Sequence, residues 1–129
     1  MKSRTHNRTF EPRFAELVRA GIKRQTIRPR GKEPPRPGDT LNLRQWTGQA
    51  YRSRQRTLRD GQRCRSVTPV LITEHGLTFD PGTNHERTLG TGPLLEAFAR
   101  ADGFTAWPEL RAWFEGRYTL PFEGHLITW

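Results

Sequence analysis

Apolar residues near the start of the chain recur with the spacing of a short amphipathic helix. They fall at i, i+3 and i+4: Phe14, Leu17 and Val18. Pro12 suits the first turn of such a helix, and Gly21 favours a left-handed cap that ends it and turns the chain sharply. Thr9 and Phe10 precede the helix as a short strand or lead-in, and residues 24–28, with two β-branched side chains, predict a short strand after the corner.

The middle of the chain alternates apolar and polar positions in the manner of β-strands. Residues 40–46 place two leucines on one face. Residues 67–73 give the strongest strand pattern, in which Pro69 indicates an edge position or a bulge. The Asp-Gly pair at 60–61 is the clearest signal for a hairpin turn, whereas residues 75–92 show no periodicity.

Two more helices and a final strand are predicted in the last third of the chain. The first helix begins at Pro93 and ends at the Asp-Gly pair at 102–103. The second carries a buried apolar stripe: Trp107, Leu110, Trp113 and Phe114. Residues 121–129 predict the strand. This order indicates one domain, residues 1–129, with an α+β fold in which helices cover a small, strongly bent sheet or barrel.

Composition indicates a small folded protein with a thin core. Leu, Ile, Val and Phe together number 26 of 129 residues, close to the edge below which chains stay disordered. Four Trp, seven Phe and two Tyr compensate, because each ring buries roughly 150–250 Å² where it is enclosed. No apolar run approaches the ~18 residues of a membrane span, and no apolar signal segment follows the basic N-terminus, so we expect a soluble, cytoplasmic protein.

Cysteine and histidine usage argues against a metal or redox site. Cys64 is the single cysteine, which excludes an internal disulfide. The four histidines lack metal-ligand spacing and are expected at the surface or in caps. We therefore expect no metal and no cofactor.

The positive charge is concentrated in one half of the chain and is almost all arginine. Lys and Arg number 22 against 13 Asp and Glu, a formal net charge of +9, and 19 of the 22 are Arg. Residues 1–65 hold 18 cations and 5 acids, a balance of +13, whereas residues 66–129 hold 4 cations and 8 acids, a balance of −4. Because arginine matches phosphate in a bidentate manner and stacks on bases, the first half is expected to bind nucleic acid or a phosphorylated ligand. An anionic membrane surface and plain surface charge are the alternatives.

The most basic stretch combines arginines with aromatic residues. Three arginines there alternate with polar residues: Arg52, Arg54 and Arg56. In an extended chain their guanidinium groups would line one face at two-residue intervals, and an irregular basic loop is the equal alternative. Trp46 and Tyr51 are neighbours of these arginines, and such rings can stack on unpaired bases. Core packing is favoured for Trp46, while both roles stay open for Tyr51.

The segment GIKRQTIR, residues 21–28, holds the strongest candidate chemistry. Lys23 and Thr26 would face opposite ways on a regular strand, so a shared site requires Lys23 to lie in the turn before the strand. If they converge, the charges of Arg24 and Arg28 together with partial burial lower the pKa of Lys23 toward neutrality. A neutral lysine can remove the proton from the Thr26 hydroxyl and make it a nucleophile. Arg28 would serve as an oxyanion donor or hold a phosphate.

A resemblance to a known family is spread over most of the chain. Its segments are F-x-P-x-F at residues 10–14, G-x-K-x-x-T-x-R at 21–28, PGDTL at 37–41, RADGF at 100–104 and PF-x-G-x-L-I-x-W at 121–129. In this order they resemble the ASCH domains, small PUA-like proteins associated with RNA. The chain looks especially like short ASCH proteins of phages and prophages, which share a segment similar to RQWTGQAYRS, residues 44–53. The resemblance implies a PUA-like β-barrel with flanking helices.

The resemblance extends, more distantly, to small bacterial N4-acetylcytidine amidohydrolases. It implies catalytic roles for the lysine and threonine of the motif, here Lys23 and Thr26, and for a later glutamate. The nearest match to that glutamate is Asp102, which is one methylene shorter.

Charge and resemblance together predict a domain that binds RNA, another single-stranded nucleic acid, a nucleotide or a modified nucleoside. The predicted contact residues are Lys23, Arg24, Arg28, Tyr51, Arg52, Arg54 and Arg56. The alternative is an enzyme, an N4-acetylcytidine-type amidohydrolase or a ribonuclease, with Lys23, Thr26 and Asp102 as catalytic residues. In a plainer interpretation, Lys23 and Arg28 only hold phosphate and the Thr26 hydroxyl is bonded locally. An acidic partner protein is a third alternative for the basic face, and no membrane partner is expected.

Overall fold

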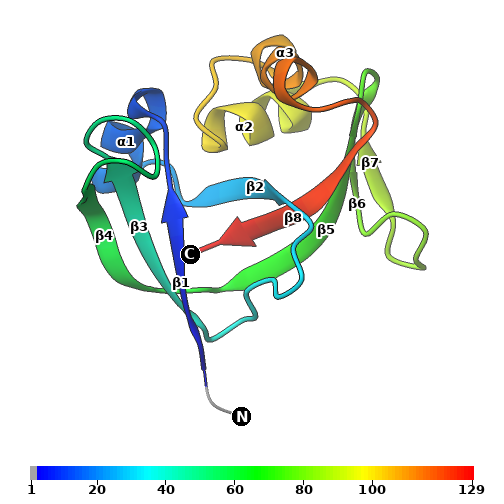
Figure 1. The fold of residues 1–129 in the computed structure, drawn as a ribbon. Helices are drawn as coiled ribbons and strands as arrows, with labels where there is room; N and C mark the ends of the chain where they lie inside the picture. The colour runs from blue at the N-terminus through cyan, green and yellow to red at the C-terminus, as the bar shows by residue number, and fades with distance from the viewer. Residues whose placement is uncertain (1–2) are drawn as a thin grey trace.

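The computed structural model describes residues 3–129 and has an α+β architecture with three helices and two sheets (Figure 1). The elements follow in the order β1 (Thr5–Thr9), α1 (Pro12–Arg19), β2 (Gln25–Pro29), β3 (Thr40–Trp46), β4 (Gln55–Arg63), β5 (Ser66–Thr73), β6 (Gly76–Phe79), β7 (Arg87–Leu89), α2 (Pro93–Ala101), α3 (Trp107–Arg117) and β8 (Phe122–Thr128). No helix in this part of the chain is both long and apolar enough to cross a bilayer.

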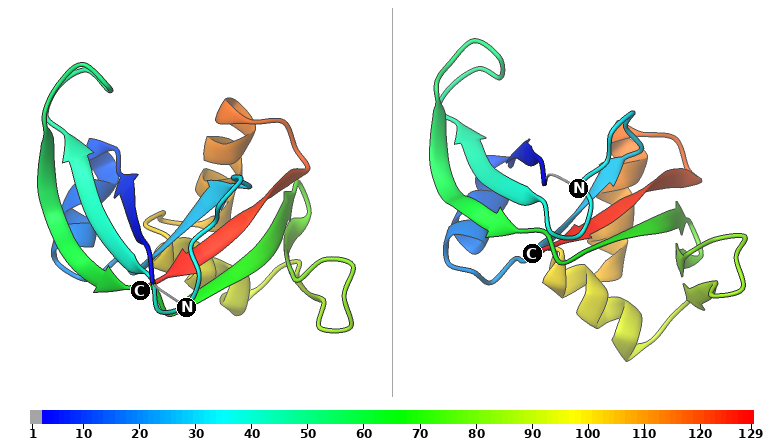
Figure 2. Two further views of the ribbon diagram at one scale, coloured as in Figure 1. Left: turned by 60° about the horizontal axis from the view of Figure 1, so that its bottom comes forward. Right: turned by 90° about the horizontal axis from the view of Figure 1, so that it is seen from below.

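The strands pair into two sheets joined by one continuous stretch of chain. The three-stranded sheet has the order β1-β3-β4, with β1 parallel to β3, and the five-stranded antiparallel sheet has the order β2-β8-β5-β6-β7. β4 runs into β5 through Cys64 and Arg65, so one stretch of chain serves both sheets (Figures 1 and 2). Within residues 3–129 no ladder joins the outer strands of the two sheets. The α+β prediction is therefore confirmed, but the strands do not close into the predicted barrel.

The helices bury their apolar faces against the sheets. α1 contacts β3 and β4 and buries three residues: Phe14, Ala15 and Val18. α2 and α3 pack together above the five-stranded sheet (Figure 1). The rings of Phe98 and Phe79 join α2 to β6 with centroids 5.7 Å apart, and those of Phe114 and Phe122 join α3 to β8 at 5.0 Å. Of the tryptophans predicted in the core, two are buried and one is partly buried: Trp107, Trp129 and Trp113.

The periodic segments form the elements predicted from them. The helix beginning at Pro12, the two C-terminal helices and the strand at residues 40–46 are confirmed. The strands predicted at 24–28, 67–73 and 121–129 form as β2, β5 and β8, with each end within one residue of the prediction.

The hairpin turn predicted at residues 60–61 is wrong, whereas the edge position predicted at Pro69 holds locally. The Asp60-Gly61 pair is not a hairpin turn but lies inside β4, in a ladder whose register shifts along β3. Gly61 has φ +70°, and its N–H donates to Asn42 Oδ1 at 2.9 Å, so side-chain bonding replaces a regular pairing. The chain reverses instead at residues 47–54. β5 lies between β8 and β6, but it pairs with β6 only from Val70 on. At Pro69 it pairs with β8 alone, so the predicted edge position is confirmed locally.

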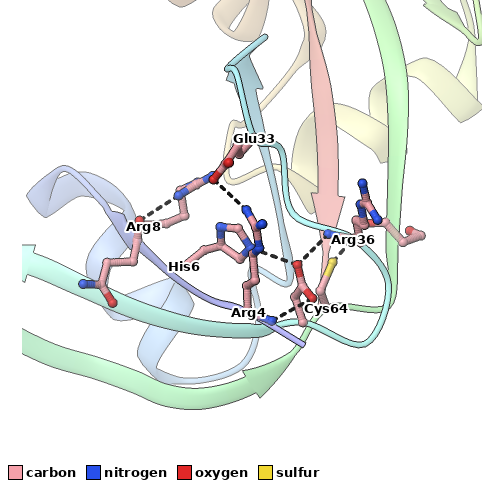
Figure 3. Close-up of polar contacts among 9 residues, drawn as sticks. Arg4, His6, Arg8, Glu33, Arg36 and Cys64 are labelled. Carbon is pink, nitrogen blue, oxygen red and sulfur yellow. Dashed lines mark hydrogen bonds and ion pairs between the residues drawn. The ribbon is translucent and has the colours of Figure 1, made fainter. Parts of the chain in front are cut away.

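A polar cluster around Asp39 fixes the first strand beside β3. The Asp39 carboxylate accepts hydrogen bonds from the backbone N–H groups of Arg4 and Arg36, at 3.1 and 3.0 Å, and contacts His6 Nε2 at 2.9 Å (Figure 3). These bonds, the one from Arg4 first, lower the pKa of Asp39 to about 2. The His6 side chain is only 11% exposed, so the expectation of a surface histidine is wrong there. The cluster holds β1 in place, and the end of β1 leads into the site described next.

Candidate functional site

A cavity of about 250 Å³ lies between α1, β2 and α3. Its walls come from the end of β1, the start of α1, the turn between α1 and β2, β2 itself, the connection between α2 and α3, and the second half of α3. Four lining residues are candidates from the sequence: Lys23, Thr26, Arg28 and Asp102. The fold therefore brings together the three residues of the GIKRQTIR segment and the distant aspartate.

Lys23 reaches the cavity because it lies in the turn between α1 and β2. Gly21 adopts φ +78°, and the backbone N–H of Lys23 donates to the Leu17 carbonyl oxygen at 3.0 Å, which closes the corner. The ladder of β2 begins at Gln25, so Lys23 lies outside it. This placement meets the condition under which Lys23 and Thr26 can share a site.

Lys23 and Asp102 form a buried pair. Lys23 Nζ lies 3.5 Å from Asp102 Oδ1, and the two side chains are 3% and 4% exposed. Nζ also donates to the backbone oxygen of Asp102, and Gln25 Nε2 donates to Oδ1 at 3.3 Å. Gly103 permits this approach, because a Cβ at that position would lie 2.9 Å from the Phe14 ring and 3.2 Å from Lys23 Cδ.

Burial moves the pKa values of both partners toward the neutral forms. Loss of hydration lowers the pKa of Lys23, and the charges of Arg28 and Arg13 lower it further. Loss of hydration raises the pKa of Asp102. The attraction between ammonium and carboxylate opposes both shifts. The free-energy difference between the charged pair and the neutral pair is therefore smaller here than in water.

Thr26 and Arg28 lie two residues apart on β2 and share one face of the strand. Arg28 Nε donates to Thr26 Oγ1 at 3.0 Å, and a terminal guanidinium nitrogen donates to the Thr9 carbonyl oxygen at 2.8 Å. Burial lowers the pKa of Arg28 to about 10, and the charge of Arg8 contributes, so Arg28 remains protonated at neutral pH. Within residues 3–129 both hydrogen-bond partners of Arg28 are neutral oxygens, so its charge remains available to an anionic ligand.

Aromatic rings of the core also form the walls of the cavity. The rings of Phe14, Phe104 and Trp113 contact one another edge to face, with centroids 5.3–6.1 Å apart. At the rim, Arg117 pairs with Glu11 at 2.7 Å and ties α3 to the start of α1. The helical periodicity identifies Phe14 and Trp113 as apolar, but it carries no signal for this second role. Sequence reasoning missed the remaining lining residues: Thr9, Phe10, Glu11, Ile27, Pro29, Phe104, Phe114, Arg117 and Tyr118.

Arg24 is a predicted contact residue, but its side chain bonds to the end of the chain. Its Nε donates to the Trp129 carbonyl oxygen at 3.1 Å, while the Trp129 N–H donates to the Arg24 carbonyl oxygen at 3.1 Å. Arg24 does not line the cavity and instead joins the start of β2 to the end of β8.

The basic stretch after β3 is part loop and part strand. None of its candidate residues lines the cavity: Tyr51, Arg52, Arg54 and Arg56. Arg52 and Arg54 lie in the 47–54 connection and Arg56 lies in β4, so the fully extended ribbon does not form. Trp46 is half-buried and lies outside the hydrophobic core, so the favoured core role is wrong. Tyr51 is 88% exposed.

The cavity is lined by both polar and aromatic side chains. A lysine–aspartate pair, a threonine hydroxyl and an arginine offer donors and acceptors within one small volume. Among residues 3–129, no group of three or more His, Cys, Asp and Glu side chains is arranged to hold a metal ion. Comparisons of the chain with protein-family models, curated proteins and solved structures found no match.

Proposed function

We propose that this chain is an RNA-binding domain of the ASCH type with a PUA-like fold, and that its cavity takes one unpaired nucleotide. The observation that carries the proposal is the convergence of Lys23, Thr26 and Arg28 in one cavity, where the described residues offer Arg28 only neutral oxygens as hydrogen-bond partners. A half-buried guanidinium that has no hydrogen-bonded carboxylate among residues 3–129 is complementary to phosphate, because charge-assisted hydrogen bonds to phosphate are short and strong.

The size and walls of the cavity fit a single nucleotide. Pockets for drug-sized ligands have volumes of about 300–1,000 Å³, and this cavity, at about 250 Å³, lies just below that range and suits the base of one nucleotide. Proteins that recognise single-stranded RNA stack splayed bases on aromatic rings and read their edges with polar groups. Phe10, Phe14 and Tyr118 supply such rings, and Asp102 and Thr26 supply polar groups.

The segments that carry the family resemblance support this choice because they meet at the cavity. Residues 10–14 and 21–28 contribute two of its walls, and residues 100–104 contribute Asp102 and Phe104. Residues 121–129 contain β8, the strand that pairs with β2 and positions Thr26 and Arg28.

Calorimetric titration with a nucleoside, its 5′-monophosphate and a short single-stranded RNA tests the proposal. The monophosphate and the RNA should bind, and the logarithm of the RNA affinity should fall linearly with the logarithm of the salt concentration. Arg28→Gln should lose the preference for the monophosphate over the nucleoside and reduce the salt slope by about 0.7, the contribution of one phosphate contact on a single strand. Arg100→Gln, at an exposed arginine of α2, is the matched control and should change neither. Absence of binding at low salt would refute the proposal.

A hydrolytic activity is the second candidate, favoured by the hydrogen bond from Arg28 Nε to Thr26 Oγ1. The Thr26 hydroxyl keeps its own proton to donate, and the guanidinium would stabilise the oxygen as that proton leaves. Within residues 3–129 no hydrogen bond joins Lys23 to Thr26, so Nζ must leave Asp102 to act as the base.

The reaction proposed for this activity is deacylation of N4-acetylcytidine. Neutral Lys23 takes the Thr26 proton, Oγ1 bonds to the acyl carbon, and the carbon–nitrogen bond breaks as the proton passes to the departing amine. Water then releases acetate from the threonine. The test is the loss of acetyl groups in the presence of the protein, with Thr26→Val as the near-isosteric variant. Turnover that persists unchanged in Thr26→Val or in Lys23→Ala would exclude this mechanism.

A further inference from the structure

The connection between β3 and β4, residues 47–54, is closed by its own hydrogen bonds. The backbone N–H and the hydroxyl of Thr47 both donate to the Arg54 carbonyl oxygen, at 2.9 and 2.8 Å. Ser53 Oγ accepts from the Gly48 N–H at 3.0 Å and donates to the Gln49 carbonyl oxygen at 2.8 Å. Bonds at its base and across its width give this loop a defined shape.

The loop and the end of β3 form an aromatic pair at the surface. Tyr51 is 88% exposed, more than any other exposed large hydrophobic residue among residues 3–129. Its ring centroid lies 5.2 Å from that of the half-buried Trp46, so one ring supports the other. Tyr51 also has φ +64°, a left-handed conformation that is uncommon for a bulky residue. Neither burial nor backbone preference accounts for a tyrosine at this position, which points to a ligand for its face.

The charge around the aromatic pair is positive. Arg52 and Arg54 are exposed on either side of Ser53, and no ion pair of either arginine is found within the described residues. Arg56, the next arginine along the chain, pairs with Glu16 at 3.3 Å. Two unpaired guanidinium groups beside an exposed ring favour a ligand that combines planar groups with negative charge.

The loop lies on the same side of the molecule as two segments that line the cavity. In both views of Figure 2, the 47–54 loop and the C-terminal end of α3 rise on one side, with the end of β1 between them. The end of β1 and the end of α3 both line the cavity. A ligand extended from the cavity can therefore run toward the loop.

We propose that Tyr51, supported by Trp46, is a second base-stacking site, and that Arg52 and Arg54 hold the phosphates beside that base. The ligand is single-stranded RNA, and the inference rests on the proposed function for the nucleotide in the cavity. Stacking of one base on an aromatic ring is sequence-tolerant, so this site adds affinity for longer strands without specifying a base.

The experiment compares a nucleoside monophosphate with an eight-nucleotide single-stranded RNA, using fluorescence anisotropy for the RNA and calorimetry for the monophosphate. Tyr51→Ala should bind the RNA about 5- to 150-fold more weakly, the range found when a stacking aromatic is removed, and bind the monophosphate as the wild type does. Tyr51→Phe keeps the ring and should restore RNA affinity. Leu94→Ala, at another exposed apolar residue, is the matched control and should change neither affinity.

The outcomes separate this inference from the proposed function. Equal RNA affinity of Tyr51→Ala and Leu94→Ala would overturn the stacking site. RNA binding that is weakened equally in Tyr51→Phe and Tyr51→Ala would overturn it too, and neither result affects the role proposed for the cavity. RNA binding that depends on Tyr51 while the monophosphate fails to bind overturns the role of the cavity and keeps the stacking site. A wild-type chain that binds neither ligand overturns both.

Discussion

Replacing Lys23 with methionine tests the buried pair on which the cavity is built. Methionine keeps an apolar chain of similar length, so the variant removes the charge of Nζ and little packing volume. Asp102, 4% exposed, then retains only the hydrogen bond from Gln25 as a polar side-chain contact. Removing one partner of a buried ion pair costs about 3–5 kcal/mol, because the other charge stays buried without its counterion.

The loss of stability should depend on pH, because a proton bound to Asp102 removes its buried charge. Burial already raises the pKa of Asp102, and without Lys23 the opposing attraction is gone. The folded variant then binds more protons than its unfolded chain, so its stability falls as pH rises above about 4, the pKa of an unfolded aspartate, up to the raised folded pKa. The additional loss of stability is at most ~1.4 kcal/mol per pH unit, the value for one bound proton.

Urea unfolding followed by tryptophan fluorescence at pH 5 and pH 8 measures both effects. Lys23→Met should be less stable relative to wild type at pH 8 than at pH 5. The double variant Lys23→Met with Asp102→Asn removes both charges, so it should lose less stability at pH 8 than the single variant and show no such pH dependence. A single variant within ~1 kcal/mol of wild type, or one that is equally destabilised at both pH values, would refute the role given to this pair.

Two further stability predictions follow from the same structure. Gly103→Ala places a Cβ 2.9 Å from the Phe14 ring at a residue with φ +99°, so it should lower the free energy of unfolding by about 2–5 kcal/mol. Gly116→Ala has no atom within 4 Å of the new Cβ and should raise the free energy of unfolding by up to ~1 kcal/mol. Equal melting temperatures of the two variants in thermal unfolding would contradict this. Because the pKa of Asp39 is lowered to about 2, its carboxylate stabilises the fold above about pH 4 and this contribution is lost as pH falls toward 2. Asp39→Asn should therefore be less stable than wild type at pH 6, and the difference should shrink on acidification.

The sequence predicts best those elements that bury a face of their own. α1 and α3 show helical spacing because their stripes pack on a neighbour, and β3 shows alternation because Leu41 and Leu43 face the core. β6 and β7 are four and three residues long, too short for a period to show. β6 is a strand because it pairs with the edge of β5, and β7 because it pairs with β6. At Asp60-Gly61 a local turn signal is overridden by the continuing ladder between β3 and β4.

The candidate site likewise contains residues that a local sequence pattern identifies and residues that it does not. Lys23, Thr26 and Arg28 come from one short segment, so a helix cap and the two-residue period of a strand suffice to bring them to one place. Asp102 lies 79 residues beyond Lys23, and only the family resemblance pointed to it. Thr9 and Tyr118 are ordinary residues whose role exists only after both sheets and α3 are assembled, so no local pattern could identify them.

The position of β8 has a consequence for the order in which the site can form during synthesis. β2 has β8 as its sole ladder partner within the described residues, and β8 lies between β2 and β5. The segment that holds Lys23 therefore leaves the ribosome about a hundred residues before the strand that will fix it. Until residues 122–128 are made, the segment that becomes β2 lacks its partner strand, so the cavity should form only after β8 has been synthesised.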